Sequence, residues 1–330
     1  MELMFLYTDK DFKEKGYIKN ATLDIENGKN GVSQNDFELT MSIDERDDSL
    51  DDDSLFYCLD SEWGGMILNK KIDTSNNTIT FKGKTFRGLL EKEYIQPPTN
   101  EAYLILSGEA NTCIKTLLDS RFNDLYVVDD IDKSGIELNY KVRDLNLLEA
   151  LEKALGSANA KLEIKYKGDG KVHLKAVLIN DLSDTLQYDN NYQVNMIVET
   201  KSKPYNHILA LGKGELTERL RVNLYLQEDG TWGDTECYIG LNRKTYKHED
   251  TNIEDETELK ANAIDKVKEQ NGTDTLSISF DSDDAELFDI VGAKEHITGI
   301  SFKQPITQKI LKGTIKAFKG NLEISYKVGE

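Results

Sequence analysis

Basic residues are scarce in this sequence of 330 residues. Lysine and arginine together number 41, against 60 aspartates and glutamates, so the formal net charge is −19. A protein that grips nucleic acid needs clustered Lys and Arg to neutralise phosphates, and the sequence has no such cluster. This charge balance argues against specific nucleic-acid binding. Taken alone, it favours a soluble surface.

Cysteine and histidine are also few. Cys58, Cys113 and Cys237 are far apart and odd in number, and no CxxC occurs. This pattern excludes a disulfide framework, and we interpret the three as reduced thiols of a protein made in a cytoplasm. The four histidines form neither HxxxH nor HExxH, so the signature of a zinc hydrolase is missing. We expect no metal and no cofactor.

Long hydrophobic runs are missing too. No apolar segment approaches the ~20 residues that a membrane span needs. The N-terminus, MELMFLYTDKDF, has no basic start and only a short apolar run, so it is no secretory signal. Regular apolar patterning with 15 Tyr and 11 Phe nevertheless argues against global disorder. The length predicts two or three domains.

The first third of the chain has the pattern of antiparallel strands. Alternation predicts strands over 17–25 and 36–43, and a further strand over 55–59. The stretch from Gly65 to Pro98 predicts two more strands around a turn at 75–77, ended by a break at Gly83. Its expected apolar anchors are Ile67, Ile72, Ile79 and Phe81. Pro97 and Pro98 indicate a boundary, so 1–98 is predicted to be a small β-barrel or sandwich.

Helical spacing follows in 99–185. Ala110, Ile114, Leu117 and Leu118 share one helix face; Leu147, Leu148, Leu151 and Leu155 share another. Asn146 with Glu149 makes a capping box before the second helix, and Gly156 provides its stop. A hairpin over 161–179 turns at 168–170. The segment is therefore predicted to be a small α+β domain.

The last part returns to strands around one more helix. We predict strands over 193–200, 207–211 and 221–226, a helix over 252–270 with Leu259, Ala263 and Val267 on its buried stripe, and strands again over 275–330. One weak internal repeat, referred to below as the internal echo, consists of four residues that recur at a constant offset of 230 residues (313 − 83). It matches Ile67, Ile72, Phe81 and Gly83 to Ile297, Phe302, Leu311 and Gly313. The echo suggests two related β domains, one at each end of the chain.

Three groups of residues could in principle form a metal-binding, nucleotide-binding or catalytic site. The acidic run Asp44–Asp53 lacks the glycine and closing glutamate of an EF-hand, so a solvated loop is the better interpretation. Gly212-Lys213-Gly214 lacks the third glycine and the βαβ unit of a dinucleotide site, which favours a tight turn. Cys113 lies near a helix start and is the one candidate nucleophile, but free cysteines are commonly buried. We therefore predict no catalytic, cofactor-binding or metal-binding residue and no enzymatic activity.

The 65–98 stretch resembles the first domain of phage tail hub proteins. The resemblance lies in its two strands, in the segment Phe86-Arg87-Gly88-Leu89-Leu90 and in the closing Tyr94-Ile95-Gln96-Pro97. The group that it resembles most is the XkdQ/YqbQ-like baseplate hub of contractile phage tails, defective prophages and tailocins. Asn206, Gly212, Gly214 and Arg219 loosely fit a further segment of that family. The region around Asp289-Ile290-Val291-Gly292 departs from it.

The resemblance implies a mainly β protein with an α+β insertion. Two tube-type antiparallel β-barrel domains would occupy 1–98 and 186–245 with 275–330; 99–185 would be the α+β insertion and 246–274 a helical insertion. Three chains would form a ring-shaped homotrimer, with the tail tube or tail-tip protein above, the spike protein below and other baseplate proteins around it. An acidic central channel would let DNA pass without binding. Such a hub lies in the baseplate of a virion or phage-like particle and assembles in the bacterial host cytoplasm.

Two other functions stay open at this stage. One is a cell-wall (peptidoglycan) hydrolase of the tail tip, which muralytic activity would support. The other is a secreted carbohydrate-binding β protein, which glycan binding and a functional signal sequence would support. The sequence carries a motif for neither, since no GxSxG or P-loop occurs and its aromatics are spread along predicted strands.

Overall fold

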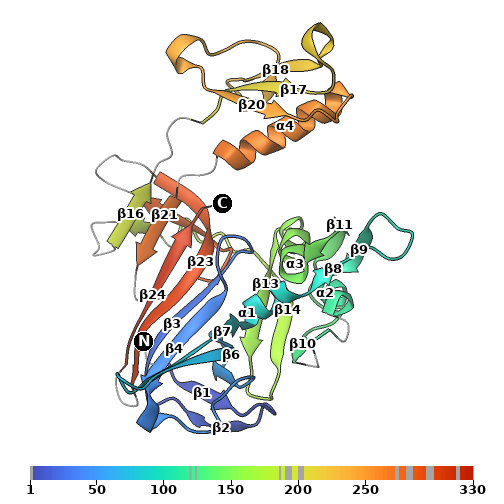
Figure 1. Ribbon diagram of the computed structural model, residues 1–330. Coiled ribbons are helices and arrows are strands. Elements are labelled where there is room, and N and C mark those ends of the chain that lie inside the picture. The colour runs from blue at the N-terminus through green and yellow to red at the C-terminus, as the bar shows by residue number, and fades with distance from the viewer. Residues whose placement is uncertain are drawn as a thin grey trace. The chain divides into compact units, whose positions relative to one another are not determined.

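The computed structural model describes residues 3–118, 121–122, 125–185, 187–189, 195–199, 204–271, 275–279, 285–294, 301–316 and 320–329. The chain separates into two compact units. The first consists of Met1–Ile197 with Leu276–Gly329, and the second of Val198–Thr275. Strands dominate both, so the predicted mainly β class is confirmed (Figure 1).

One long sheet dominates the first unit. Its order is β16-β21-β24-β23-β3-β4-β7-β6-β5-β1-β2, and β22 joins β15 to β23. The strands are β1 Phe5–Thr8, β2 Glu14–Tyr17, β3 Asn20–Gly28, β4 Asp36–Ser42, β5 Leu55–Cys58, β6 Gly64–Asp73, β7 Thr78–Thr85, β15 Gln187–Asp189, β16 Asn195–Glu199, β21 Thr275–Ser279, β22 Ile290–Lys294, β23 Ser301–Lys316 and β24 Asn321–Val328. Strands from the two ends of the chain thus lie side by side at β23 and β3 (Figure 1).

Alternation explains which face of the long sheet is buried. In β3 and β4, Leu23 and Ile25 pair with Leu39 and Phe37, and all four are buried. The residues between them, such as Asp24 and Glu38, lie on the opposite face, because successive strand side chains point to opposite sides. The predicted strands over 17–25, 36–43 and 55–59 therefore exist, within a few residues of their predicted ends.

Two expectations for the 65–98 stretch are wrong. Gly83 does not end a strand, because β7 continues to Thr85. A Cβ atom at Gly83 would meet the backbone oxygen of Met66 at 1.9 Å, so the glycine permits close strand contact beside a register shift in β6. Ile72 is no core anchor, because it is 56% exposed at the end of β6. Ile67, Ile79 and Phe81 are buried as predicted.

The segment 99–185 combines helices and strands, and we refer to it as the α+β part. Its elements, with the short ones leading into it, are α1 Phe86–Leu89, β8 Tyr94–Ile95, β9 Leu104–Glu109, α2 Ala110–Leu118, β10 Tyr126–Val128, β11 Glu137–Val142, β12 Leu145–Asn146, α3 Leu147–Gly156, β13 Ala160–Tyr166 and β14 Val172–Leu178. Asn146 caps α3 by accepting a hydrogen bond from the Glu149 amide at 2.9 Å. The apolar faces of both helices enter one core with β13 and β14.

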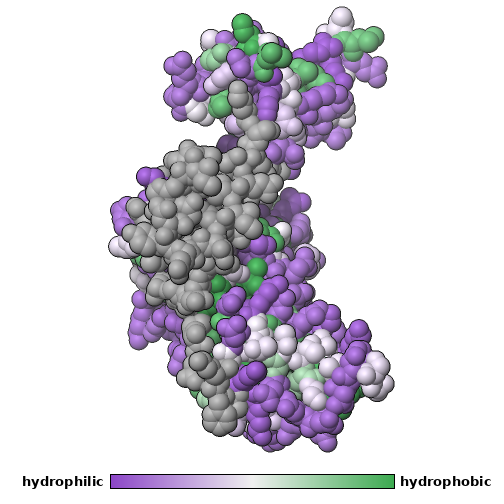
Figure 2. Space-filling model, turned by 90° about the vertical axis from the view of Figure 1, so that its left-hand side faces the viewer, coloured by the Kyte–Doolittle hydropathy of each residue, from purple (hydrophilic) through white to green (hydrophobic). Residues whose placement is uncertain are grey.

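The second unit is a four-stranded sheet packed on one helix. Its elements are β17 His207–Leu211, β18 Arg221–Leu226, β19 Trp232–Gly233, β20 Thr245–Glu249 and α4 Glu256–Asn271. The predicted stripe Leu259, Ala263 and Val267 is fully buried against β17 and β18. Hydrophobic groups remain at the surface of this unit (Figure 2). Leu241, in the 3₁₀ helix Gly240–Asn242, is fully exposed.

The grouping of the strands differs from the predicted domain boundaries. The prediction joined 186–245 with 275–330 in one barrel and treated 246–274 as an insertion. Instead β17, β18, β19 and β20 pair only among themselves in the described part of the chain, and α4 covers them. The apolar stripe of α4 covers the inner faces of β17 and β18, and these strands in turn bury the stripe. Helix and strands therefore form one unit.

No closed sheet occurs among the strands that the structure describes: the path of the long sheet ends at β16 and at β2. The acidic run Asp44–Asp53 lies in the connection between β4 and β5, and Gly212 and Gly214 lie in the connection between β17 and β18. None of the helices in the described ranges is both long and apolar enough to cross a membrane.

Candidate functional site

The long sheet has a polar face that extends across several of its strands. Across six strands, the register places Glu323, Lys312, Asp24, Glu38, Lys82 and Asn69 in one row. Lys312 lies 2.8 Å from Asp24, and Lys82 forms an ion pair with Glu38. Each pair is at least two-fifths exposed, so its contribution to stability is small. The row is a mixed-charge surface that faces solvent in the single chain.

A local two-fold relation runs through this sheet. Gly83 pairs with Phe37 of β4 and Ile67 of β6; Gly313 pairs with Leu23 of β3 and Leu322 of β24. A Cβ at either glycine would lie 1.9 Å from a backbone oxygen of the adjacent strand. These positions are the ones matched by the internal echo. β7 and β6 therefore lie beside β4 as β23 and β24 lie beside β3. The local two-fold axis that relates the two halves passes between Asp24 and Glu38.

Of the other echo positions, Phe81 and Leu311 are both fully buried. Ile72 is exposed, whereas the burial of its counterpart Phe302 is not described. Ile297 lies outside the described residues. The repeat is thus carried mainly by the β7 and β23 strands and their glycines.

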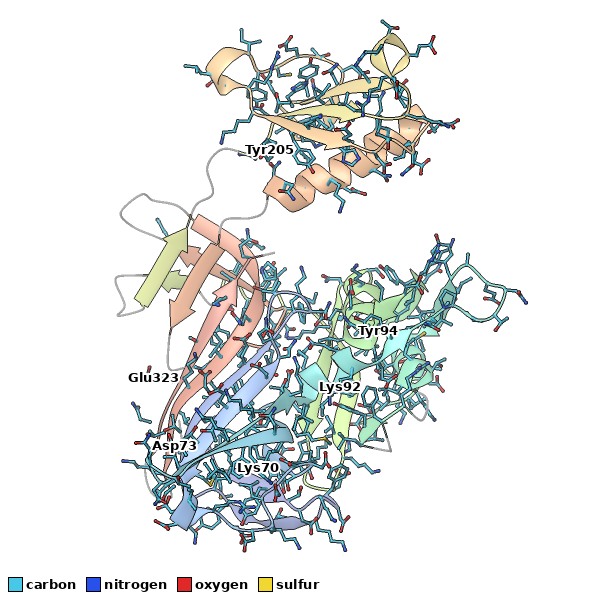
Figure 3. The ribbon with its side chains drawn as sticks, in the orientation of Figure 1. Lys70, Asp73, Lys92, Tyr94, Tyr205 and Glu323 are labelled. Atoms are coloured by element: carbon cyan, nitrogen blue, oxygen red, sulfur yellow. The ribbon has the colours of Figure 1, made fainter. Side chains whose placement is uncertain are left out.

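Both outer strands of this repeat have a partly unpaired edge. β5 pairs with the start of β6, at Gly64–Met66, and the backbone of Ile67 hydrogen-bonds to Asp53 and Ser54. The outer edge of β6 beyond Ile67 has no partner among the described strands. β21 likewise pairs only with the end of β24, from Ser325. Figure 3 shows Lys70 and Asp73 on β6 and Glu323 on β24, at these two edges. An unpaired strand edge is a template for pairing with another chain.

A buried ionic cluster joins the long sheet to the α+β part. Arg87 of α1 is fully buried, and its guanidinium donates to Glu62 at 2.6 and 3.1 Å. It also contacts Glu152 of α3 at 3.4 Å and donates to the Leu162 carbonyl at 3.3 Å. Glu152 in turn accepts from the backbone amide of Asn30, in the β3–β4 turn, at 2.9 Å. One arginine thus holds four chain segments together.

Burial dominates the electrostatics of this cluster. Desolvation raises the pKa of Glu152 to about 7, while Arg87 and the Asn30 amide act in the opposite direction. The pKa of Arg87 is raised because Glu62 and Glu152 outweigh its desolvation. In the sequence, Arg87 stands out only as part of the segment Phe86-Arg87-Gly88-Leu89-Leu90. A lone arginine among apolar residues at 86–90 was the available signal for a buried ion pair.

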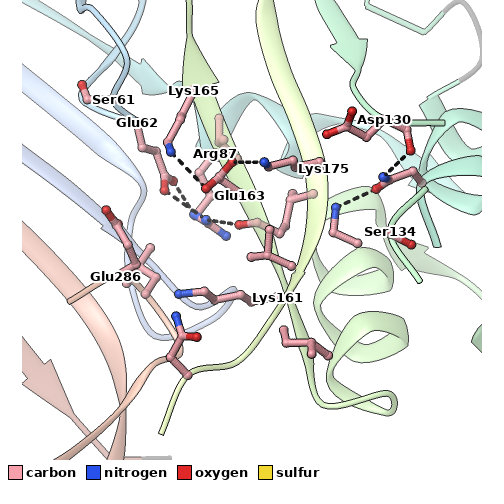
Figure 4. A pocket seen from close by; sticks show the side chains of 18 of the residues that line it. Ser61, Glu62, Arg87, Asp130, Ser134, Lys161, Glu163, Lys165, Lys175 and Glu286 are labelled. Carbon is pink, nitrogen blue, oxygen red and sulfur yellow. Dashed lines mark hydrogen bonds and ion pairs between the residues drawn. The ribbon is translucent and has the colours of Figure 1, made fainter. Parts of the chain in front are cut away.

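A pocket of about 560 Å³ opens beside this cluster. Its walls come from β13 and β14 on one side and from β3 and β23 on the other. Lys161 of β13 points across it, toward Glu286 (Figure 4). The Lys161 ammonium lies 2.7 Å from Asp289, and both side chains are nearly inaccessible. Lys309 of β23 lies 3.3 Å from Glu286 and 5.4 Å from the centre of the Trp63 ring.

The acidic run is a structured loop. The Asp47 carboxylate accepts from the amide and the hydroxyl of Ser49, which lowers its pKa. Arg46 contacts Asp51 at 3.3 Å, and Lys70 of β6 forms an ion pair with the same carboxylate. Within the described residues, no group of His, Cys, Asp and Glu is arranged to hold a metal ion. Cations of the chain itself take up part of the acidic charge.

The Asn206–Arg219 segment shapes a turn. The Asn206 side chain donates to the Asn242 carbonyl at 2.7 Å and accepts from the Lys244 amide at 2.8 Å. Gly214 adopts φ +103°, where a side chain would collide with the Glu218 carbonyl. Arg219 donates to the Gly212 carbonyl at 3.3 Å. The glycine pair lies in the connection between β17 and β18, which is longer than the predicted tight turn because it includes a 3₁₀ helix at Leu216–Glu218.

Cys113 is a buried core residue of α2. It is 6% exposed and packs with Ile114 and Leu117 in the core of the α+β part. Burial raises the pKa of its thiol, and the nearby Glu109 and Glu137 raise it further. Because the thiolate is the nucleophilic form, this environment disfavours reactivity. The preferred interpretation of Cys113 as a core cysteine is confirmed.

Comparison with solved structures identifies the fold. The chain aligns over its whole length with a tail protein from Neisseria meningitidis MC58, at 12% identity, 97% coverage of that protein and a TM-score of 0.55. It aligns over 98% of its length with the 43 kDa tail protein of prophage MuSo2 from Shewanella oneidensis, at 8% identity, 98% coverage and a TM-score of 0.58. A chain of the phage P2 baseplate in its activated conformation matches at 13% identity, with 99% and 98% of the two chains covered and a TM-score of 0.51.

These likenesses define the class: the chain has the fold of phage tail and baseplate proteins. The resemblance found in the sequence is therefore confirmed at the level of the fold. All three structures are named as tail or baseplate components, and none of the three names describes an enzyme. The sequence itself matches no protein-family model and no curated protein.

Proposed function

We propose that the chain is a structural hub in the tail of a phage or phage-like particle. Three copies would form a ring that joins a six-fold tail tube, above, to a three-fold spike, below. The proposal rests on the shared fold with tail and baseplate proteins and on one observation above all: the two partly unpaired edges of the long sheet. The hub would act as a scaffold in the baseplate, among other baseplate proteins, without catalysis.

The two edges suit a head-to-tail ring. They belong to β6 and β24, the strands that the local two-fold relation matches, so they lie on opposite sides of the same six-stranded region. The β6 edge of one copy can hydrogen-bond to the β24 edge of the next, and a head-to-tail contact closes into a ring when the rotation fits. Ile72 supports this use of β6. It pairs with the buried Ile79 yet is 56% exposed, as expected of an apolar residue that a neighbour covers.

Two tube-type domains would supply this ring. We propose that one is built from 1–98 and the other from β16 and β21 to β24, with 99–185 as the α+β domain between them. Each is an open piece of sheet in the single chain, and pairing between copies would close the barrel. The second unit, β17 to α4, would be an appendage of the ring.

The polar face of the long sheet would line the central channel. The resemblance to tail hubs implies an acidic lining, but Lys82 and Lys312 stand among the carboxylates of the central row. We therefore propose a channel of mixed charge. The net charge of −19 would still disfavour tight binding of DNA that passes through it, because like charges repel.

Substitution at the proposed ring contact tests the hub. Ile72→Glu places a charge at the β6 edge, where the single chain has no partner, so it should leave folding intact and prevent ring formation. Ile72→Val is the matched control and should assemble as wild type does. Size-exclusion chromatography with light scattering measures the assembly. Rings that persist in Ile72→Glu would refute the proposed edge contact.

A further inference from the structure

The Lys161–Asp289 pair lies in the interior of the first unit. Lys161 extends from β13 (Figure 4), and its ammonium is 2.7 Å from the carboxylate of Asp289, the residue directly before β22. The two side chains are 6% and 3% exposed. Charges buried this deeply lose their hydration, and their mutual attraction offsets that cost only when the geometry is excellent. The fold therefore holds an amine and a carboxyl group in contact where water hardly reaches them.

The backbone fixes the Asp289 carboxylate in position. One oxygen accepts a hydrogen bond from the Asn180 amide at 2.9 Å, and the other accepts one from the Glu286 amide at 3.0 Å. The preceding residue, Phe288, adopts φ +69°, a left-handed conformation that is rare for a bulky side chain. The Lys161 ammonium makes no hydrogen bond among the described residues, although it lies against the carboxylate. The contact is therefore close but lacks the alignment of a stabilising ion pair.

We propose that Lys161 and Asp289 condense to an intramolecular isopeptide bond. The ammonium first transfers a proton to the carboxylate. The neutral Nζ then attacks Cγ, and the Asn180 and Glu286 amides stabilise the negative oxygen that forms during the attack. A bond between Nζ and Cγ forms and one Cγ–O bond breaks. The oxygen leaves as water with two of the three ammonium hydrogens, so no oxidant, reductant or other reactant is needed.

Confinement and burial both favour this bond. In dilute solution, water favours the separate ammonium and carboxylate. Holding two reacting groups in a productive geometry raises their effective concentration to about 10⁵–10⁸ M. The product is a neutral amide, so the two buried charges disappear when it forms. The burial that makes the ion pair costly therefore favours the amide that replaces it.

The bond ties distant parts of the chain together. It joins β13 of the α+β part to the segment that leads into β22 of the long sheet. The second unit, Val198–Thr275, lies between the two residues in the sequence, so the covalent loop encloses it. A cut within the second unit leaves the two parts of the first unit connected. The proposal does not depend on the hub, since both residues belong to the first unit of one chain.

The mass of the denatured protein is the first test. Electrospray mass spectrometry should give the wild-type sequence mass minus one water molecule. Lys161→Met should show no such deficit, whereas Lys165→Met, which changes a partly exposed lysine of the same strand, should keep it. A wild-type mass equal to the sequence mass, even after prolonged incubation of the folded protein, overturns the proposal. A deficit that persists in Lys161→Met also overturns it.

Cleavage within the loop distinguishes this bond from any other loss of water. A site for a sequence-specific protease can be inserted between Asp229 and Gly230, in an exposed turn of the second unit. Mass spectrometry confirms the cut, which adds one water molecule. On a reducing, denaturing gel the two fragments should then run as one species, and those of Lys161→Met should separate. Fragments that separate with Lys161 present refute the bond, whether or not Lys161→Met folds.

Discussion

Arg87 is the residue on which the joint between the long sheet and the α+β part depends. It is fully buried and contacts Glu62, Glu152 and the Leu162 carbonyl. Removing one member of a buried ion cluster strongly lowers the free energy of unfolding, because the remaining charges stay buried without a partner. Replacing the whole cluster by apolar residues would change this free energy much less. Exposed pairs behave differently, since water solvates each partner that is left.

Arg87→Met is therefore expected to lower the free energy of unfolding by about 3–5 kcal/mol. Methionine keeps most of the buried volume, so the loss comes from the unpaired carboxylates of Glu62 and Glu152. Lys82→Met, in the exposed pair with Glu38, should cost less than about 1 kcal/mol. Urea denaturation followed by circular dichroism measures both. Equal losses in the two variants would contradict the role assigned to Arg87.

Glu152 gives the joint a pH dependence of definite sign. Its pKa is raised from 4.5 to about 7, because desolvation outweighs Arg87, the Asn30 amide and the charge of Lys29. The folded state then holds a proton that the unfolded chain releases, so the contribution of Glu152 to stability is full below pH 4.5 and falls as the pH rises to about 7. Above that pH the contribution stays constant.

The glutamine variant isolates this effect. Glu152→Gln removes the titrating group but keeps an oxygen that can accept from the Asn30 amide. The decline of stability between pH 4.5 and 7 should be smaller than in wild type. Denaturation midpoints measured at half-unit steps across this range give the comparison. Parallel pH profiles of the two proteins would show that another group causes the decline.

Several residue roles could be predicted from sequence, and others could not. The Leu259, Ala263 and Val267 stripe and the Asn146 cap are local features, since helix spacing and a single cap fix them. The partners of Arg87 come from distant segments, so no local pattern reveals them. Ile72 was misjudged for a related reason: alternation gives the face of a strand but not whether a neighbouring strand covers its end.

At the scale of elements, the paired glycines are the most sensitive points of the long sheet. Gly83→Ala would push a Cβ against the Met66 oxygen in β6, and Gly313→Ala would push one against the Asn321 oxygen in β24. Neither contact is with a flexible side chain that could move aside. The neighbouring strand must shift, and with it the β6–β7 or β23–β24 pairing.

Gly83→Ala and Gly313→Ala are each expected to cost about 1–3 kcal/mol, the usual range for forcing extra volume into a packed region. Gly156→Ala provides the control. It lies at the last position of α3, where an added Cβ meets nothing within 4 Å, so alanine should be neutral or slightly stabilising. Thermal unfolding of the three variants tests this order. A stable Gly83→Ala would mean that β6 and β7 are less closely paired than described.

Strand bounds were predictable where hydrophobic periodicity is uninterrupted. β17 and β18 begin and end where the sequence predicted, at His207–Leu211 and Arg221–Leu226. The predicted end of β7 at Gly83 is wrong, because the prediction assumed that the conformational freedom of glycine breaks the strand. The actual role of Gly83 is steric, since only a hydrogen in place of Cβ fits beside β6.

At the scale of the molecule, sequence patterns gave the fold class but not the arrangement of strands. β23 pairs with β3 and thereby joins the two ends of the chain in one sheet. Alternation says that each strand has a buried face and does not say which strand lies beside it. The internal echo was the one sequence signal that reached across this distance. Its glycines do occupy matching positions in β7 and β23.

The mass of the purified protein in solution distinguishes a trimeric hub from a single chain. We would measure it by light scattering, with negative-stain images of the same sample, alone and after co-expression with the tail-tube protein. A hub of three copies should have three times the 37.4 kDa chain mass and be seen as three-fold rings with a central opening. A single-chain mass without rings in both preparations would contradict the proposed hub.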